Sequence, residues 1–232
     1  MQTFLIRNIK VHPFASSDQL ISYADSHKGI LVAVNAEKVV NAKQTLIDII
    51  NSNIGYCDGA GAVKVAHKKG IKNAVRIPGC ELWLEIIARF YRTKKFYLIG
   101  STEDVITRTV KKLETEFPGI SIVGRRDGYI HSSDDEDRII EDVANKCPDI
   151  VFVAMGSPRQ ELFMQRLQQV NRAIYQGLGG SFDLYVGNFT RAPKCMQAVG
   201  CEWLWRFIAQ PTRIRRITSY LKYAWLLYAG KL

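Results

Sequence analysis

The sequence predicts an α/β fold in which a parallel, doubly wound sheet carries helices on both faces. Short apolar runs rich in β-branched residues, such as residues 30–34 and 150–154, are typical of buried parallel strands. Each run ends in a polar or glycine-rich turn, and a helical segment follows. This alternation of strands and helices is the pattern of a sheet that is covered on both sides.

The predicted elements follow one another regularly up to about residue 187. Residues 3–6 and 10–11 form a leading strand or hairpin, and the later strands are 30–34, 55–57, 95–99, 120–123, 150–154 and 173–176. The helices are 17–27 with Ser17 as its N-cap, 35–51, a segment ending near 69, 81–92, 102–117, 134–145 and the segment after Ser157. Beyond them the chain is helical, aromatic and basic. We therefore divide it into a core, residues 1–190, and a C-terminal appendage, residues 191–232.

The bulk composition indicates a globular cytoplasmic protein. Of 232 residues, 47% are hydrophobic and 23% are charged, which allows a sizeable core and argues against disorder. No stretch reaches the ~20 apolar residues of a membrane span, and the first residues do not resemble a signal peptide. The five cysteines and four histidines show neither a CxxC pair nor the spacing of a metal site. The sequence thus predicts reduced thiols and no bound metal.

The formal net charge of +10 is concentrated near the C-terminus. Residues 205–232 contain no acidic residue and six basic ones, namely Arg206, Arg213, Arg215, Arg216, Lys222 and Lys231. A basic segment of this kind indicates phosphate-bearing partners: nucleic acid, anionic lipid or a pyrophosphate-linked substrate.

One face of this segment is apolar and aromatic. Ile214, Ile217, Leu221, Trp225 and Tyr228 recur at helical spacing, and we call them the aromatic stripe. With its flanking cations, the stripe favours a helix that lies in a membrane interface. The alternative is a C-terminal helix that packs the same stripe on its own core. Nucleic-acid binding explains the segment less well, because no recognised module surrounds the charge.

Four predicted strands end in polar or glycine-rich turns. These turns contain Asn35, Asp58-Gly59, Gly100-Ser101 and Gly156-Ser157. Ligands of open α/β sheets bind outside the carboxyl ends of the strands, so one site built from several loops is expected. A carboxylate at the mouth of such a cleft is suited to act as a general base toward a hydroxyl, and Asp58 is the candidate. The alternative is that Asp58 is the N-cap of the following helix.

The Met-Gly-Ser-Pro turn is expected to form the floor of this site. Ser157 would cap a helix whose first turn begins at Pro158, so that free N–H groups face an anion. Arg159, Gln160 and Glu161 occupy that first turn, within reach of a ligand above the sheet. The alternative is an ordinary strand-to-helix turn with a good cap.

The common phosphate-binding and metal-binding motifs are missing from the sequence. Gly-Leu-Gly-Gly at 177–180 does not complete a GxGxxG fingerprint, and no P-loop sequence occurs. The acidic run 134–137 fits a solvated helix start better than a metal site. Phosphate charge would then be met by helix N-termini, Arg76, Arg159 and the basic C-terminal segment.

A series of ordered motifs covers nearly the whole chain. They are Asn35-Ala36-Glu37-Lys38, Asp58-Gly59-x-Gly61, Asp127-Gly128-Tyr129, Ala154-Met155-Gly156-Ser157-Pro158-Arg159-Gln160-Glu161, Gly179-Gly180-x-Phe182-Asp183, Arg191-Ala192-Pro193, Glu202-Trp203-Leu204-x-Arg206 and Gln210-Pro211-x-Arg213. Together they resemble the bacterial lipid-linked-glycan glycosyltransferases of family 26. That family includes the teichoic-acid N-acetylmannosaminyltransferase and the N-acetylmannosaminuronic acid transferase of enterobacterial common antigen, and the first and fourth motifs resemble the latter more closely.

The resemblance implies a metal-independent, inverting transferase with a Rossmann-like core and no cofactor. The donor would be UDP-linked N-acetylmannosaminuronic acid, and the acceptor N-acetylglucosamine on undecaprenyl pyrophosphate, at the inner face of the cytoplasmic membrane. The family's base aspartate falls on Asp58. With the Met-Gly-Ser-Pro turn included, the expected nucleotide-sugar-binding residues are Asn35, Arg76, Gly156, Ser157, Arg159, Gln160 and Asp183. The residues expected to bind the acceptor pyrophosphate and the membrane are Arg191, Arg206, Arg213, Arg215, Arg216, Lys222 and Trp225.

The choice of donor leaves alternatives open. Teichoic members carry a catalytic threonine just before the asparagine, where this chain has Ala33-Val34. A uronate donor needs a basic partner for its carboxylate, and Lys38 and Arg159 are the candidates. The alternatives are transfer of neutral N-acetylmannosamine or another hexose to a similar acceptor, and a non-catalytic protein that binds phosphates or lipids. Nucleic acid is not an expected partner, whereas a homo-oligomer is compatible with the sequence.

Overall fold

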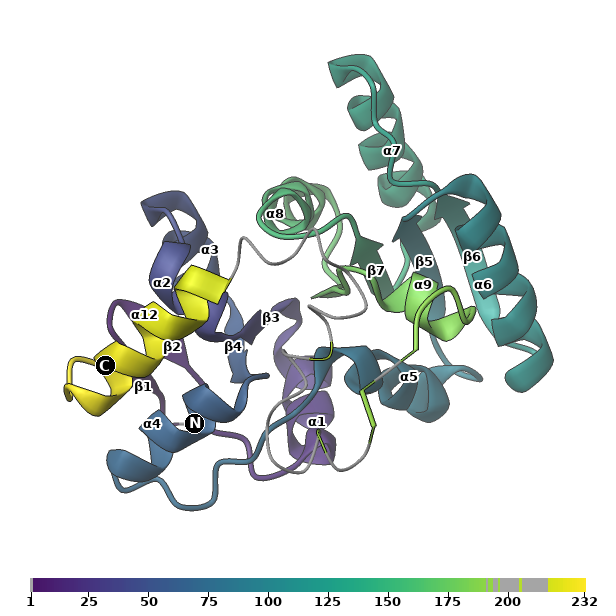
Figure 1. Cartoon of the computed structure of the whole chain (residues 1–232). Helices are drawn as coiled ribbons and strands as arrows, with labels where there is room; N and C mark the ends of the chain where they lie inside the picture. Colours follow the sequence, from purple (N-terminus) through teal and green to yellow (C-terminus); the bar gives the residue numbers. More distant parts are fainter. Residues whose placement is uncertain (1, 191, 194–195, 197–204, 206–216) are drawn as a thin grey trace.

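The computed structural model describes residues 2–190, 192–193, 196, 205 and 217–232, and its centre is a six-stranded sheet (Figure 1). The strand order is β4-β3-β8-β7-β5-β6, and every neighbouring pair is parallel. The strands are β3 (Gly29–Val34), β4 (Ile54–Cys57), β5 (Lys95–Gly100), β6 (Ser121–Arg126), β7 (Ile150–Ala154) and β8 (Ile174–Gly177). An antiparallel hairpin, β1 (Phe4–Ile6) and β2 (Ile9–Val11), precedes them. The predicted α/β fold with a parallel sheet is confirmed.

Helices cover both faces of the sheet, as the alternating pattern predicts. They are α1 (Ser17–His27), α2 (Ala36–Asn41), α3 (Gln44–Ser52), α4 (Ala60–Lys68), α5 (Gly79–Phe90), α6 (Glu103–Glu116), α7 (Ser133–Lys146), α8 (Arg159–Val170), α9 (Ser181–Tyr185) and α12 (Ile217–Tyr228). Strand β7 shows how one strand serves two cores, because successive side chains point to opposite faces. Val151 and Val153 belong to the core beneath α2, α3, α4, α7, α8 and α12, whereas Ile150 and Phe152 belong to the core beneath α1, α5, α6 and α9.

The direction of the crossovers reverses between β5 and β7, which are neighbours in the sheet. From β5 the chain passes through α6 to the outer strand β6, and from β7 it passes through α8 to β8 on the other side. The carboxyl ends of two such strands diverge into a crevice, which is where open α/β sheets bind ligands. By this rule, ligand binding is expected next to the Gly100 and Gly156 turns.

The predicted helices 35–51 and 17–27 differ from the structure in an interruption and in a cap. The helix expected over 35–51 is interrupted at Ala42-Lys43, where the backbone is extended, and its halves pack on different neighbours: α2 on α12, and α3 on β2 and α8. Tertiary packing therefore overrides a locally continuous helical pattern. Helix α1 is capped by Ser16 rather than Ser17, because Ser16 Oγ accepts from Gln19 N while Gln19 Oε1 accepts from Ala15 N.

Helix α12 lies beyond the predicted boundary at residue 190 and packs against α2 and α4 (Figure 1). Its buried side chains include Ser219, Tyr223, Leu226 and Leu227. Tyr223 and Leu227 belong to the same core cluster as strand β3. In the described part of the chain, no helix is long and apolar enough to cross a bilayer.

Candidate active site

Asp58 lies directly after β4, at the carboxyl edge of the sheet, and is half-buried. Its Oδ1 accepts a hydrogen bond from the backbone N of Gly79 at the start of α5, with an N–O distance of 2.9 Å. Arg76 Nε donates to the backbone O of Asp58 at 2.9 Å. The N-cap of the following helix is Gly59, without a side-chain cap bond. The alternative that Asp58 caps α4 is therefore wrong, and its carboxylate is oriented by α5 instead.

The neighbours of Asp58 on β4 stay protonated. Burial, followed by the negative charge of Asp58, raises the pKa of the Cys57 thiol to about 12. Burial, again followed by Asp58, raises the pKa of Tyr56 well above its ordinary value. Neither side chain can accept a proton at neutral pH, because a thiol and a phenol must first ionise to act as bases. At the end of β4, Asp58 is the side chain that can act as a base.

Asn35 follows β3 and lies beside the Asp58 turn. Its Oδ1 accepts from Lys38 N at 3.1 Å, which makes Asn35 the N-cap of α2. The backbone N of Asp58 donates to Val34 O at 3.2 Å, so the ends of β3 and β4 are tied together. The predicted proximity of Asn35 and Asp58 is observed, although the amide oxygen of Asn35 is already engaged by the helix.

A buried chain of three polar side chains links the ends of β3, β7 and β8. Lys38 Nζ lies 3.3 Å from Glu161 Oε1, and the two side chains are only 8% and 2% exposed. Gln160 Nε2 donates to the same Glu161 oxygen at 3.1 Å. Gln160 Oε1 accepts from Gly156 N at 3.1 Å and from Gly179 N at 3.0 Å. We call Lys38, Glu161 and Gln160 the polar bridge.

The polar bridge contacts the Met-Gly-Ser-Pro turn through Gly156. In this turn the predicted Ser157 cap and the predicted free N–H groups are both wrong. Ser157 is exposed and does not cap α8, whose N-cap is Pro158 without a side-chain bond; the Ser157-Pro158 peptide is cis. The N–H of Gly156 is not free for an anion, because Gln160 Oε1 accepts it. Arg159 is exposed, and its Nη2 lies 3.3 Å from Ile130 O. Of the predicted residues in this turn, Ser157 and Arg159 face solvent.

Asp183 lies at the carboxyl end of β5. It is on α9, and its carboxylate accepts from Ser101 Oγ at 2.8 Å and from Asn188 Nδ2 at 3.0 Å. Ser101 follows β5, and its carbonyl accepts from Gly128 N at 2.8 Å. The predicted site residue Asp183 is thus brought to the carboxyl edge of the sheet from a distant part of the sequence.

A groove of about 320 Å³ lies beside the Met-Gly-Ser-Pro turn, between α7 and α8. Ile130, Met155, Pro158 and Arg159 are among its lining residues. Among the described residues, no three His, Cys, Asp or Glu side chains come together as metal ligands.

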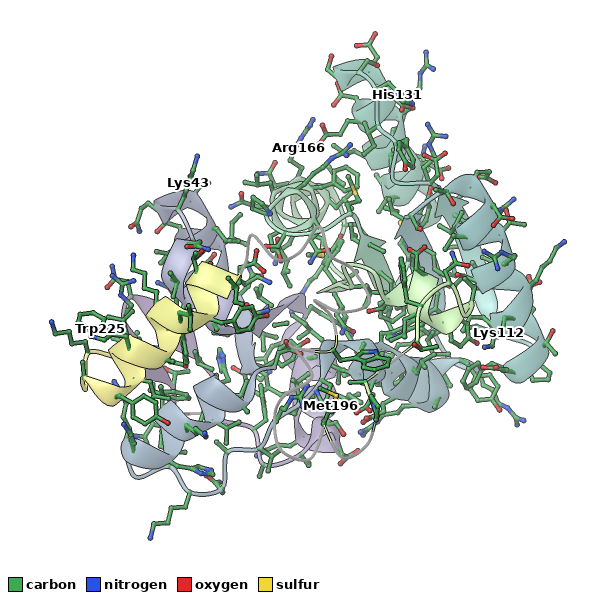
Figure 2. All side chains as sticks on the ribbon, viewed as in Figure 1. Lys43, Lys112, His131, Arg166, Met196 and Trp225 are labelled. Atoms are coloured by element: carbon green, nitrogen blue, oxygen red, sulfur yellow. The ribbon has the colours of Figure 1, made fainter. Side chains whose placement is uncertain are left out.

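Three of the four described residues of the aromatic stripe are exposed, and the fourth, Ile217, is partly buried. Leu221, Trp225 and Tyr228 are 65%, 58% and 84% exposed, and Figure 2 shows Trp225 on the outer side of the molecule. The alternative that this stripe packs on its own core is therefore wrong, because the opposite face of α12 is the buried one. Lys222 is exposed on the same helix. The predicted cations Arg191, Arg206, Arg213, Arg215 and Arg216 lie outside the described residues.

Sequence reasoning missed the contribution of three residues to the site. Gly79 orients Asp58 through its backbone, and this role leaves no signature in a side chain. Glu161 was placed in a first helical turn facing a ligand, but it is 1% exposed. Tyr223 is not part of the aromatic stripe, and it is an aromatic residue of α12 that is buried. Position 223 falls on the opposite side of the helix from the stripe residues, and this spacing was the signal in the sequence.

The chain matches the family model described as "Glycosyl transferase WecG/TagA/CpsF family" over residues 5–232. The match includes the residues after β3, β4 and β7 that form the site, and also α12. Membership implies transfer of a sugar to a lipid-linked glycan and a part in polysaccharide biosynthesis. The chain therefore belongs to the WecG/TagA/CpsF family of glycosyltransferases.

Proposed function

We propose that this chain is an inverting transferase that moves N-acetylmannosaminuronic acid from UDP to N-acetylglucosaminyl-pyrophosphoryl-undecaprenol. The observation that carries the proposal is the carboxylate of Asp58, which is held by Gly79 N at the sheet edge, directly after the protonated Tyr56 and Cys57. The branch of the family is supported by the Asn-Ala-Glu-Lys and Ala-Met-Gly-Ser-Pro motifs.

The proposed reaction is a single displacement. The acceptor hydroxyl oxygen attacks C1 of the donor sugar as its proton passes to a carboxylate oxygen of Asp58, and the bond from C1 to the UDP oxygen breaks with inversion. The leaving UDP carries the bonding electron pair. We place UDP at the carboxyl ends of β5 and β7, near Ser101 and Asp183, and we expect Arg76 and the C-terminal arginines to offset its charge. We expect this charge compensation to make the reaction independent of divalent metal.

The test is a transfer assay with purified protein, a short-chain N-acetylglucosaminyl pyrophosphoryl lipid, and EDTA throughout. Product from the UDP-N-acetylmannosaminuronic acid donor supports the proposal. Product from the neutral N-acetylmannosamine donor alone would keep the family and change the donor, whereas binding of the lipid without product from either donor would favour a non-catalytic protein.

Arg159→Ala is expected to weaken use of the uronate donor and to leave the neutral donor unaffected. Lys38, the other candidate for the donor carboxylate, is already paired with Glu161, so the exposed Arg159 is the better partner. Loss of a charged hydrogen bond predicts a fall in kcat/KM of roughly 10-fold or more for the uronate donor. Arg172→Ala, an exposed arginine before β8 at the opposite edge of the sheet, is the control. Equal losses with both donors would contradict this role of Arg159.

We further propose that the aromatic stripe rests on the inner leaflet of the cytoplasmic membrane. Leu221→Ser with Trp225→Ser is expected to reduce binding to anionic phosphatidylglycerol vesicles by at least roughly 10-fold, because two exposed apolar side chains are lost from the contact. Co-sedimentation measures this directly. Val170→Ser removes an apolar side chain that is 46% exposed at the end of α8 and should change nothing. Undiminished binding of the double variant would contradict the proposed contact.

A further inference from the structure

Helix α12 covers the two helices that leave the predicted catalytic turns. Helix α2 begins directly after Asn35, and α4 begins two residues after Asp58. The Nδ2 atom of Asn41, the last residue of α2, donates to Ser219 Oγ at 2.7 Å. At the far end of α4, Lys68 Nζ donates to Leu227 O at 2.8 Å. Helix α12 is therefore fastened to both helices.

Tyr223 of α12 lies against the first turn of α4, which follows Asp58. A Cβ atom built on Gly61 would lie 2.4 Å from Tyr223 Cε1 and 2.9 Å from Cζ, which is closer than side-chain carbons approach one another. Gly61 lies within α4 and has no positive φ angle, so its backbone does not require glycine. The glycine at this position is explained by the ring that rests on it.

The contact lies one helical turn from the catalytic group. Gly61 is three positions after Asp58, in the first turn of α4, and Gly59 O accepts from Ala62 N at 3.0 Å across that turn. Tyr223 and Cys57 also belong to the same buried core cluster. The ring thus contacts the chain three positions after Asp58 and shares a core cluster with the residue before it.

We propose that Tyr223 is a positioning residue for Asp58, and that its ring acts by packing on Gly61. We call this packing the Tyr223–Gly61 contact. This inference rests on the proposed function of Asp58 as the base. Tyr223 acts through the first turn of α4, because the ring fixes the direction in which the chain leaves β4. A base must lie within hydrogen-bond distance of the acceptor hydroxyl, so a small displacement of this turn lowers the rate of the chemical step more than substrate binding.

Gly61→Ala and Tyr223→Ala, alone and combined, test the Tyr223–Gly61 contact. Each single variant is expected to lower kcat by roughly 10-fold or more, with little change in the KM of the donor. In the Tyr223→Ala background, Gly61→Ala should cause almost no further loss, because the added methyl group no longer meets a ring. Tyr223→Phe keeps the ring and should keep kcat, since the Tyr223 hydroxyl is buried without a hydrogen-bond partner among the described residues. Lys64→Ala, an exposed position of α4, is the control.

The assay uses the full chain and a short-chain acceptor in detergent, so that vesicle binding does not enter. The rate at which the buried Cys57 is alkylated, relative to the exposed Cys147, measures the packing around the Tyr223–Gly61 contact without any transfer reaction. This rate should increase in Tyr223→Ala but not in Tyr223→Phe. Multiplicative losses in the double variant, or an unchanged kcat in folded Tyr223→Ala, would overturn the positioning role and leave the proposed function intact. Transfer that is absent in the wild-type protein would overturn both.

Discussion

Asp58→Asn is expected to lower kcat by about 10²–10⁴-fold, because the amide cannot accept the proton of the acceptor hydroxyl. The substitution is nearly isosteric, and its side-chain oxygen can still accept the hydrogen bond from Gly79 N. The fold and the KM of the donor should therefore be little changed. Rates at saturating donor and acceptor, together with a thermal unfolding curve for each variant, separate the loss of a base from the loss of structure.

Asp48→Asn is the matched control for this prediction. Asp48 lies on the exposed side of α3, where its carboxylate accepts from Gln44 Nε2, and it is distant from the carboxyl edge of the sheet. It should retain full activity. An Asp58→Asn protein whose kcat fell by less than roughly 10-fold would mean that another group accepts the proton.

Lys38→Met is expected to be among the most destabilising single substitutions in the protein. It leaves the carboxylate of Glu161, a side chain that is 2% exposed, without its cationic partner. Removing one member of a buried ion pair typically costs about 3–5 kcal/mol, which for a domain of this size lowers Tm by roughly 10 °C. Thermal unfolding followed by circular dichroism gives the shift.

The combined variant Lys38→Met with Glu161→Gln separates the effect of the unpaired charge on stability from the effect of altered packing. It removes both charges while keeping the volume, and it should recover most of the lost stability. Lys43→Met, an exposed lysine two residues after α2, should leave Tm nearly unchanged. If the double variant were no more stable than Lys38→Met, the ion pair would not be the source of the loss.

The sheet and the position of Asp58 could be predicted because both depend on local sequence. Strands buried on both faces require apolar runs such as residues 150–154, and a carboxylate directly after such a run must lie at the sheet edge. The pairing of Lys38 with Glu161 could not be predicted, because it joins residues 123 positions apart in sequence. From residue type alone, Lys38 and Glu161 are each expected to be exposed to solvent or to a ligand.

The two faces of α12 illustrate the same limit. Helical spacing identified the aromatic stripe correctly as one face, but spacing does not say which face is buried. The inward face is marked by Tyr223 and Leu227, whose partners on α4 are 159 or more positions away in sequence. Truncation at residue 190 would remove these core contacts together with the stripe, so point substitutions are the sharper test of the membrane contact.

The long reach of α12 also bears on how the chain folds. The bonds from Asn41 to Ser219 and from Lys68 to Leu227 span 178 and 159 positions, and β8 must insert between β3 and β7. Contacts of such sequence separation form late, because a long loop must close before they are gained. During synthesis the outer sides of α2 and α4 therefore stay uncovered until residues 217–228 leave the ribosome. Until then, the apolar surface that Tyr223 and Leu227 will cover is available to chaperones and to aggregation.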